Sequence, residues 1–349
     1  MYTRKLKEKT NHIISKGKAN FGSFSEVSQR LDIKGMRSPY AGIPLPAFIS
    51  NLRIKSRVFY TFSFDENIGM VDFFDFKAFG LAEVIIWDKK TGKKCVYHNI
   101  MPPRRRFVPT NTDDGNCTCF RKARFTRIKW KNNHQRFKVD ISLKGDKVRP
   151  NFFAKIRSSE ITSSMMFVAP APTSSRCTAS WFSTMKITGR MDTKDVSLAQ
   201  EMTGLACQSL SRAYYKFHTN QTWALGIGNL KGKDIIFHML HSNLDAADEN
   251  SYNHNELIID GETTLLPPVV ITTPFGISKT WVIQDTENMV DLTFTPVSVQ
   301  SRTLNIIIMR TEYSSIYGTF DGVLLDKNGE KVVLKNFPGL VYKNRIRTF

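Results

Sequence analysis

The chain of 349 residues lacks an uninterrupted apolar run of about 18 residues, roughly the length that a membrane-spanning helix needs. Its basic first segment, residues 1–22, has no apolar core and no small-residue cleavage site, so we do not expect it to act as a secretory signal. The sequence therefore predicts a cytoplasmic protein without a transmembrane segment.

Cysteine is scarce, and the five cysteines are an odd number. Cys117 and Cys119 are separated by one residue and no second pair follows, so their spacing is not that of a zinc site. His238, His241 and His254 also lack the frame of a zinc-binding motif. We expect reduced thiols, no disulfide framework and no metal.

Motifs for nucleotides and for activated nucleophiles are missing as well. The chain has no G-x-S-x-G phrase, no P-loop and no kinase signature. Gly226-Ile-Gly228 is too short for a dinucleotide fingerprint and lies among strand-like residues. We expect no cofactor.

Charge of one sign is in excess, with 50 Lys and Arg against 31 Asp and Glu and a net charge of +19. Such a field attracts polyanions and anionic membranes. The densest basic segment, 121–138, interleaves cations with aromatic residues, as single-strand nucleic-acid binders do. It also alternates as a half-buried strand does, which is the favoured interpretation. A non-enzymatic protein that binds an anionic membrane or nucleic acid through Arg121, Lys122 and Arg124 is the alternative hypothesis.

Strand patterns occupy nearly the whole chain. Short runs rich in β-branched and aromatic residues, such as 57–64 and 82–88, are bounded by turn residues. Asn328-Gly329 indicates a type I′ hairpin turn. One helix is considered, over 195–212, although its glycine and hydroxyl residues weaken it. The pattern predicts an all-β protein with two barrel-like or sandwich domains.

Four phrases of the C-terminal half carry a family resemblance. They are, in order, WALGIGNLKGKDIIFHM (223–239), NHNELIIDGETTLLPPVVI (253–271), TWVIQDTENMVDLTFTP (280–296) and YGTFDGVLLDKNGEKVVLKNFPGLVYKNR (317–345). Together they resemble the family named domain of unknown function 2804, and the resemblance runs from about residue 40 to the end.

The resemblance implies the fold of the hydroxyneurosporene synthase and AttH group, in which two lipocalin-like antiparallel barrels pack together. On this basis we expect a basic lead over 1–35, a first barrel over 36–192 and a second barrel over 193–349. Fold relatives of this kind include carotenoid hydratases and cyclases of natural-product pathways, which is an analogy of fold and not of chemistry.

The chain departs from the family pattern at three points. The order Asn255-Glu256 is reversed, and Ser180 stands where many members carry a lysine shortly after the match to Thr178. No Asp–aromatic–Ser/Thr phrase precedes Trp223. A family activity that needs these groups would be altered here.

A polar loop supplies the candidate catalytic groups. Residues 241–256 are dense in Asn, His and Asp and end at Asn255-Glu256, where an apolar strand begins. Inside an apolar barrel Glu256 would have a raised pKa and could transfer a proton, while Asn253 and Asn255 would hold a carbonyl or an oxyanion. The favoured alternative is that these residues cap the loop, since neighbours on a regular strand face opposite sides.

Aromatic residues complete the candidate set. Tyr215 is a candidate acid or hydrogen-bond donor, or it packs between the domains, and His218 nearby is a candidate ligand-binding residue. Trp181 and Trp223 are candidate ligand-lining residues, or core residues. The leading hypothesis is a protein that binds a hydrophobic small molecule such as a lipid or isoprenoid, with or without acting on it as a cofactor-independent hydratase, isomerase or cyclase.

Overall fold

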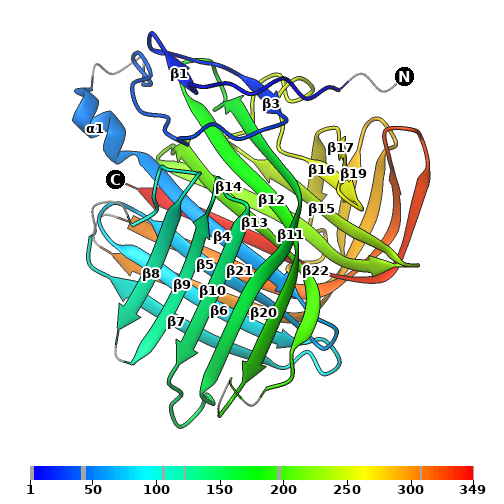
Figure 1. The fold of residues 1–349 in the computed structure, drawn as a ribbon. Coiled ribbons are helices and arrows are strands. Elements are labelled where there is room, and N and C mark those ends of the chain that lie inside the picture. Colours follow the sequence, from blue (N-terminus) through cyan, green and yellow to red (C-terminus); the bar gives the residue numbers. More distant parts are fainter. Residues whose placement is uncertain are drawn as a thin grey trace.

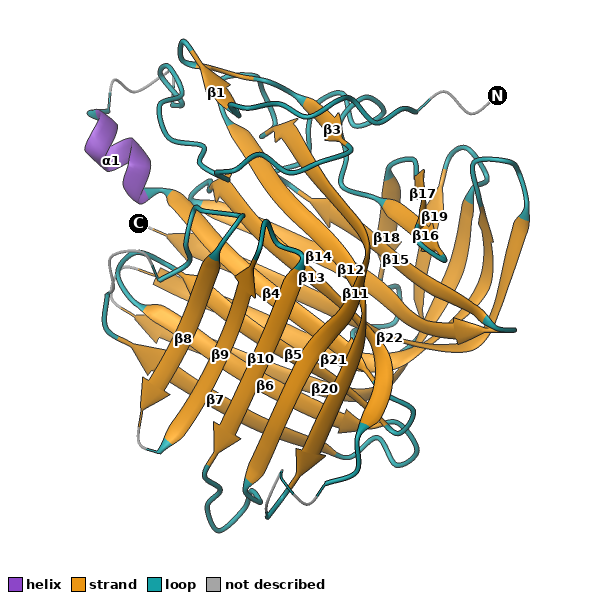
Figure 2. Cartoon of the chain, viewed as in Figure 1, coloured by secondary structure: helices purple, strands orange, loops and turns teal. Residues whose placement is uncertain are grey.

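The computed structural model describes residues 4–40, 45–103, 107–121, 123–194, 197, 199–306 and 309–348. Strands dominate these ranges (Figure 2), and α1 (Ala47–Leu52) is the only α-helix within them. The all-β prediction is therefore confirmed.

Eleven strands of the described residues form the first large sheet: β3 (Gly22–Phe24), β4 (Ile54–Ser63), β5 (Asn67–Asp75), β6 (Gly80–Asp88), β7 (Lys94–Met101), β8 (Gly115–Arg121), β9 (Arg124–Lys131), β10 (Arg136–Leu143), β11 (Phe152–Pro170), β12 (Cys177–Asp192) and β13 (Met202–Tyr214). Their order is β7-β6-β5-β4-β13-β12-β11-β10-β9-β8, with β3 against β11. Because β7 contacts β8, the sheet curls into a nearly closed barrel. The short strands β1 (Ile14–Ser15) and β2 (Lys18–Ala19) pair separately.

Nine strands of the described residues form the second large sheet: β14 (His218–Leu230), β15 (Lys233–Ser242), β16 (Glu256–Ile259), β17 (Glu262–Leu265), β18 (Val269–Thr272), β19 (Trp281–Asp285), β20 (Val290–Ile306), β21 (Met309–Leu325) and β22 (Lys331–Thr348). Their order is β17-β16-β15-β14-β22-β21-β20-β19-β18, which makes a half-barrel. Figure 1 shows this sheet behind and beside the first one.

The helix considered over 195–212 is wrong for the described part of that segment. Residues 202–214 form β13, which lies between β12 and β4 and pairs with both. Pairing with β4 joins residues about 150 positions apart, from Leu205 with Ser63 to Tyr214 with Ile54, so no local sequence pattern indicates it. Residues 195, 196 and 198 lie outside the described residues. The chain passes from the first sheet to the second between Tyr214 and His218, and the domain ranges expected from the sequence stay a prediction.

Strands β5 and β6 are buried on both faces. On β6, Val84 and Ile86 point into the first barrel, whereas Leu81, Ile85 and Trp87 belong to a second core between the two sheets. A third core fills the half-barrel. The second sheet therefore acts as the cover of an apolar surface that water would otherwise reach.

Aromatic side chains dominate the core between the sheets. The Tyr342 ring stacks on Trp223 and on Tyr313, with centroid distances of 5.6 Å and 5.9 Å. Phe59 of the first sheet meets the Trp223 ring edge-on at 5.0 Å. Such aromatic pairs stabilise beyond the area that they bury.

This architecture predicts that the sheet interface contributes strongly to stability. Ile85→Ala removes a fully buried side chain from it and should lower the free energy of unfolding by about 2–5 kcal/mol. Val333→Ala, at an exposed position of β22, should change it by less than about 0.5 kcal/mol. Urea unfolding of both variants measures the difference, and equal small effects would contradict a continuous core at the interface.

Candidate functional site

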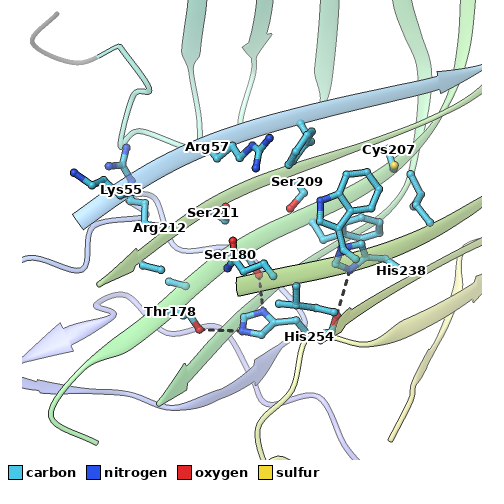
Figure 3. Close-up of a pocket in the computed structure, with 18 of the residues that line it drawn as sticks. Lys55, Arg57, Thr178, Ser180, Cys207, Ser209, Ser211, Arg212, His238 and His254 are labelled. Carbon is cyan, nitrogen blue, oxygen red and sulfur yellow. Dashed lines mark hydrogen bonds between the residues drawn. The ribbon is translucent and has the colours of Figure 1, made fainter. Parts of the chain in front are cut away.

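A pocket of about 90 Å³ lies between the two sheets, and not inside either barrel as the candidate carboxylate was expected to be (Figure 3). The first sheet lines it with Lys55, Arg57, Phe59 and Thr61 of β4, Thr178, Ala179, Ser180 and Phe182 of β12, and Cys207, Ser209, Ser211, Arg212 and Ala213 of β13. Tyr215, which follows β13 and whose backbone N–H donates to the carbonyl of Arg53, lines it from the same side. The opposite wall consists of Gln221, Trp223, Leu225, His238, Leu240 and His254.

Strand alternation on β13 explains why a space remains here. Cys207, Ser209, Ser211 and Ala213 share the face that looks toward the second sheet, because side chains on a strand alternate. All four are small, whereas the neighbouring parts of the interface carry aromatic rings. The pocket is the place where small side chains fail to fill the gap between the sheets.

The Nδ1 side of the His238 ring, on β15, is fixed by two neighbouring groups. Its Nδ1 lies 3.2 Å from the backbone oxygen of His254 and 3.3 Å from Oε1 of Glu256. A carbonyl can only accept, so Nδ1 carries the hydrogen and Nε2 of the neutral ring is the basic nitrogen. Because His238 lines the pocket, Nε2 is the nitrogen available to a ligand. The ring also lies against Phe182, with centroids 5.3 Å apart.

Glu256 is fully buried behind His238 and does not line the pocket. Burial raises the pKa of its carboxyl, and the neighbouring His238 opposes that rise. The Nδ1 hydrogen is directed at the His254 carbonyl, so the contact with Glu256 is electrostatic and not an aligned hydrogen bond. Within the described residues both carboxyl oxygens lack a hydrogen-bond partner.

His254 is fixed by two hydroxyl groups of β12. Nδ1 lies 2.8 Å from Oγ of Ser180, and Nε2 lies 3.1 Å from Oγ1 of Thr178 (Figure 3). Burial, and then the neighbouring His238, lower the pKa of His254 to about 3. The ring therefore stays neutral and ties the polar loop to the first sheet.

Cationic side chains stand at the other end of the pocket. Arg57 donates two hydrogen bonds to Asp72, from Nε at 2.8 Å and from Nη2 at 2.6 Å. Nζ of Lys55 donates to the backbone oxygen of Leu52 at 3.1 Å. Burial lowers the pKa of Lys55 to about 8. A bidentate pair of this kind neutralises the buried charge of Arg57.

A polar row leads away from the pocket through the sheet interface. Gln221, Asn344, Tyr313 and Arg302 are successive cross-strand neighbours on the second sheet. Facing them, Glu83 accepts a hydrogen bond of 2.9 Å from the Tyr313 hydroxyl and lies 3.9 Å from Arg302. Burial, reinforced by the nearby Asp72 carboxylate, raises the pKa of Glu83 to about 7.

The structure brings Tyr215 and Trp223 to the pocket and leaves Trp181 out of it. The Tyr215 hydroxyl donates to Gln221 at 3.2 Å, and burial raises its pKa to about 12. Trp181 packs inside the first barrel against Trp130, where its Nε1 donates to a serine hydroxyl at 3.0 Å. The two faces of a strand could not be told apart from sequence, so core and pocket tryptophans looked alike.

Asn253, Asn255 and His218 lie outside the pocket. Asn255 accepts from the amide of Leu240 and donates to the carbonyl of Pro267, each at 2.8 Å, so both ends of its amide serve the backbone. The side-chain oxygen of Asn253 accepts a hydrogen bond from the backbone N–H of Asn255 at 3.0 Å, and this bond caps the loop. His218 is exposed at the start of β14.

The predicted anionic-surface residues are partly engaged. Arg121 donates to the backbone oxygen of Ile100. Arg124 donates to the backbone oxygen of Lys144 at 3.1 Å and to a neighbouring aspartate. Lys122 lies outside the described residues. The role of this cluster stays a prediction.

His238, His254 and Ser180 were missed as site residues, because the sequence considered the two histidines only as metal ligands. Ser180 and His254 are 74 positions apart, and a contact over that distance has no signal in a single sequence. In the described part of the chain no group of three or more His, Cys, Asp and Glu is placed to hold a metal ion. No helix in that part is long and apolar enough to cross a membrane.

The sequence profile of the family Domain of unknown function (DUF2804) matches residues 3–347. The chain belongs to this family. No curated protein sequence matches it.

Solved structures resemble this DUF2804 protein. A crystal structure described as an AttH from Nitrosomonas europaea is 11% identical, has a TM-score of 0.50, and is covered over 92% of this chain and 99% of that one. Kievitone hydratase from Nectria haematococca is 10% identical, with a TM-score of 0.45 and coverage of 94% and 98%. CghA is 10% identical, with a TM-score of 0.45 and coverage of 84% and 88%. The likeness to AttH shows a shared fold.

The two hydrogen bonds of the Asn255 side-chain amide predict that this residue stabilises the fold. Asn255→Ala leaves the Leu240 amide and the Pro267 carbonyl without partners, and each buried unsatisfied group costs about 1–3 kcal/mol. Chemical denaturation should show a clear loss of stability, whereas Asn250→Ala, in the exposed part of the same loop, should be neutral. Equal midpoints for the two variants would contradict this role.

Glu83 predicts a pH dependence of stability. Its folded pKa of about 7 lies above the ordinary value of 4.5, so the stability present below pH 4.5 is lost as the pH rises through 7. Glu83→Gln stays neutral, and its stability relative to the wild type should rise over that window by on the order of 3 kcal/mol. Unfolding curves at several pH values test this, with exposed Glu66→Gln as the matched control. Parallel wild-type and variant curves would contradict it.

Proposed function

We propose that this protein binds a hydrophobic small molecule of lipid or isoprenoid type between its two sheets and changes it by proton transfer without a cofactor, as a hydratase, isomerase or cyclase. The observation that carries the proposal is His238, which lines a largely apolar pocket while its Nδ1 is held by the His254 carbonyl beside the buried Glu256.

The pocket supports acid–base chemistry by His238. Nε2 takes a proton from the bound molecule or delivers one to it, and the imidazolium that forms is stabilised by the Glu256 carboxylate 3.3 Å from Nδ1. Phe59 and Trp223 exclude water from the reacting groups. Glu256 then acts through His238 as a positioning residue, and not as the direct proton donor that the sequence suggested.

Polar groups on both walls orient the ligand. The hydroxyls of Ser209 and Ser211 line the pocket from β13, and the amide of Gln221, which accepts a hydrogen bond from the Tyr215 hydroxyl, lines it from β14. A few placed polar groups on an apolar lining are typical of sites for small molecules. They suit a ligand with one oxygen function near the atom that exchanges a proton.

The volume limits what the pocket encloses. A space of about 90 Å³ is smaller than the roughly 300–1,000 Å³ of pockets that bury a whole drug-sized ligand. It accommodates the reacting end of a larger molecule, and the remainder requires side chains such as Phe59 and Leu240, both only half-buried, to move aside.

Native mass spectrometry of protein purified gently from its own host, followed by organic extraction, tests binding. A discrete apolar adduct supports the proposal. The extracted compound is then incubated with the protein in D₂O, where proton transfer places deuterium on it. His238→Asn keeps a donor near the Nδ1 position and removes Nε2, so exchange should slow by about 10²–10⁴-fold while binding persists.

His218→Asn is the matched control, because His218 is exposed and lies outside the pocket. Its exchange rate should equal that of the wild type. Absence of any apolar adduct, together with failure of extracted host lipids to bind the protein, contradicts the binding proposal. Equal exchange by wild type and His238→Asn contradicts the role of His238.

A further inference from the structure

An apolar cluster on the surface lies next to the pocket. We define the α1 patch as Phe48 and Leu52 of α1 together with Phe217, which are 67%, 55% and 53% exposed. Phe217 joins the helix through Arg53, whose guanidinium lies 4.1 Å from the centroid of the Phe217 ring. Figure 1 shows α1 standing out from the sheets near the C-terminus.

Two contacts connect the α1 patch to the pocket. Lys55 lines the pocket, and its Nζ donates to the carbonyl of Leu52, the last residue of α1. Arg53 donates from Nε to the backbone oxygen of Tyr215 at 3.2 Å, and Tyr215 also lines the pocket. The patch therefore sits at the cationic end of the pocket, where the sheets part.

Cationic side chains outnumber carboxylates beside the α1 patch, where Arg30, Lys34, Lys77 and Arg212 line one hollow with Phe48 and Leu52 against Asp32 and Asp75. Arg53 follows the helix, Lys216 precedes Phe217, and the exposed Arg347 is the cross-strand partner of His218. The whole chain carries a charge of +19. Exposed aromatic and aliphatic side chains with an excess of neighbouring cations match the interface of an anionic bilayer, where the apolar groups enter the acyl boundary and the cations meet the headgroups.

We propose that the α1 patch docks the protein on an anionic lipid bilayer and places the pocket next to the membrane. Charge complementarity favours lipid as the occupant over a second, equally cationic copy of the chain. Docking itself does not depend on the proposed function. The transfer of an apolar ligand from the bilayer to the pocket does rest on the proposed function.

Flotation of the full chain with phosphatidylcholine vesicles, with and without phosphatidylserine, tests docking with no pocket ligand present. Binding should require phosphatidylserine and weaken as salt is raised. The triple variant Phe48→Ser, Leu52→Ser and Phe217→Ser should lower partitioning more than about tenfold, because burying each such side chain is worth about a tenfold change or more.

The matched control replaces three exposed apolar residues far from α1 in the sequence: Phe120→Ser, Val148→Ser and Phe275→Ser. It removes a similar number of exposed apolar groups and should bind vesicles as the wild type does. Equal loss in both triple variants, or no vesicle binding by the wild type, overturns the proposal. So does a wild-type dimer in size-exclusion chromatography that only the α1 triple variant dissolves, because a second copy would then cover the patch.

The two proposals fail separately. A protein that floats with vesicles but carries no apolar adduct keeps the docking and loses the proposed function. A protein that carries an adduct but does not float keeps the pocket and loses the α1 patch as a membrane contact.

Discussion

The middle of the first sheet is apolar on both of its faces, and the rest of the structure follows from that constraint. A strand such as Gly80–Asp88 has one row of side chains for the barrel interior and a second row that water would otherwise reach. Burying that second row requires another apolar surface, and the strongest favourable contribution to folding comes from such burial. The half-barrel supplies the surface with a band of aromatic rings centred on Trp223 and Tyr342.

Charged groups within this interface are paired with groups of opposite charge or with hydrogen-bond donors. Arg57 is matched with Asp72 by two short hydrogen bonds, and Glu83 meets Arg302 and a tyrosine hydroxyl. Isolated charges would be expensive in such surroundings, whereas paired and hydrogen-bonded ones are tolerated. Arg57 and Asp72 lie on neighbouring strands of the first sheet, whereas the hydrogen bond from Tyr313 to Glu83 joins the two sheets. A shift of one sheet against the other would break that hydrogen bond.

Much of the fold was readable from the sequence because strand patterns are local. Alternation in 57–64 and 82–88 identified real strands, and the family phrases confirmed the kind of fold. The helix over 195–212 failed because a weak local preference competes with pairing to two flanking strands, one of them about 150 positions earlier. Only a contact map could have revealed that competition.

The site was less predictable, for a geometric reason. Tyr215 and Trp223 were identified, since large side chains on strands either fill cores or line pockets. Trp181, the other candidate, packs in the core of the first barrel and not at the pocket, and nothing in the sequence says which face of a strand meets which partner. His238 is recognisable as a pocket residue only when β15 is seen packed against the first sheet, and Glu256 acts through its contact with that histidine.

The pocket is assembled from two walls that the chain joins through one short connection, residues 215–217. A ligand that contacts both walls therefore links the two sheets, and its binding free energy adds to the stability of their association. The small residues of β13 set the shape of one wall, while β14 and β15 bring the titratable groups of the other. Substitutions on the first wall can change which molecule fits without disturbing the groups that move protons, which gives a single scaffold a simple route to new specificities.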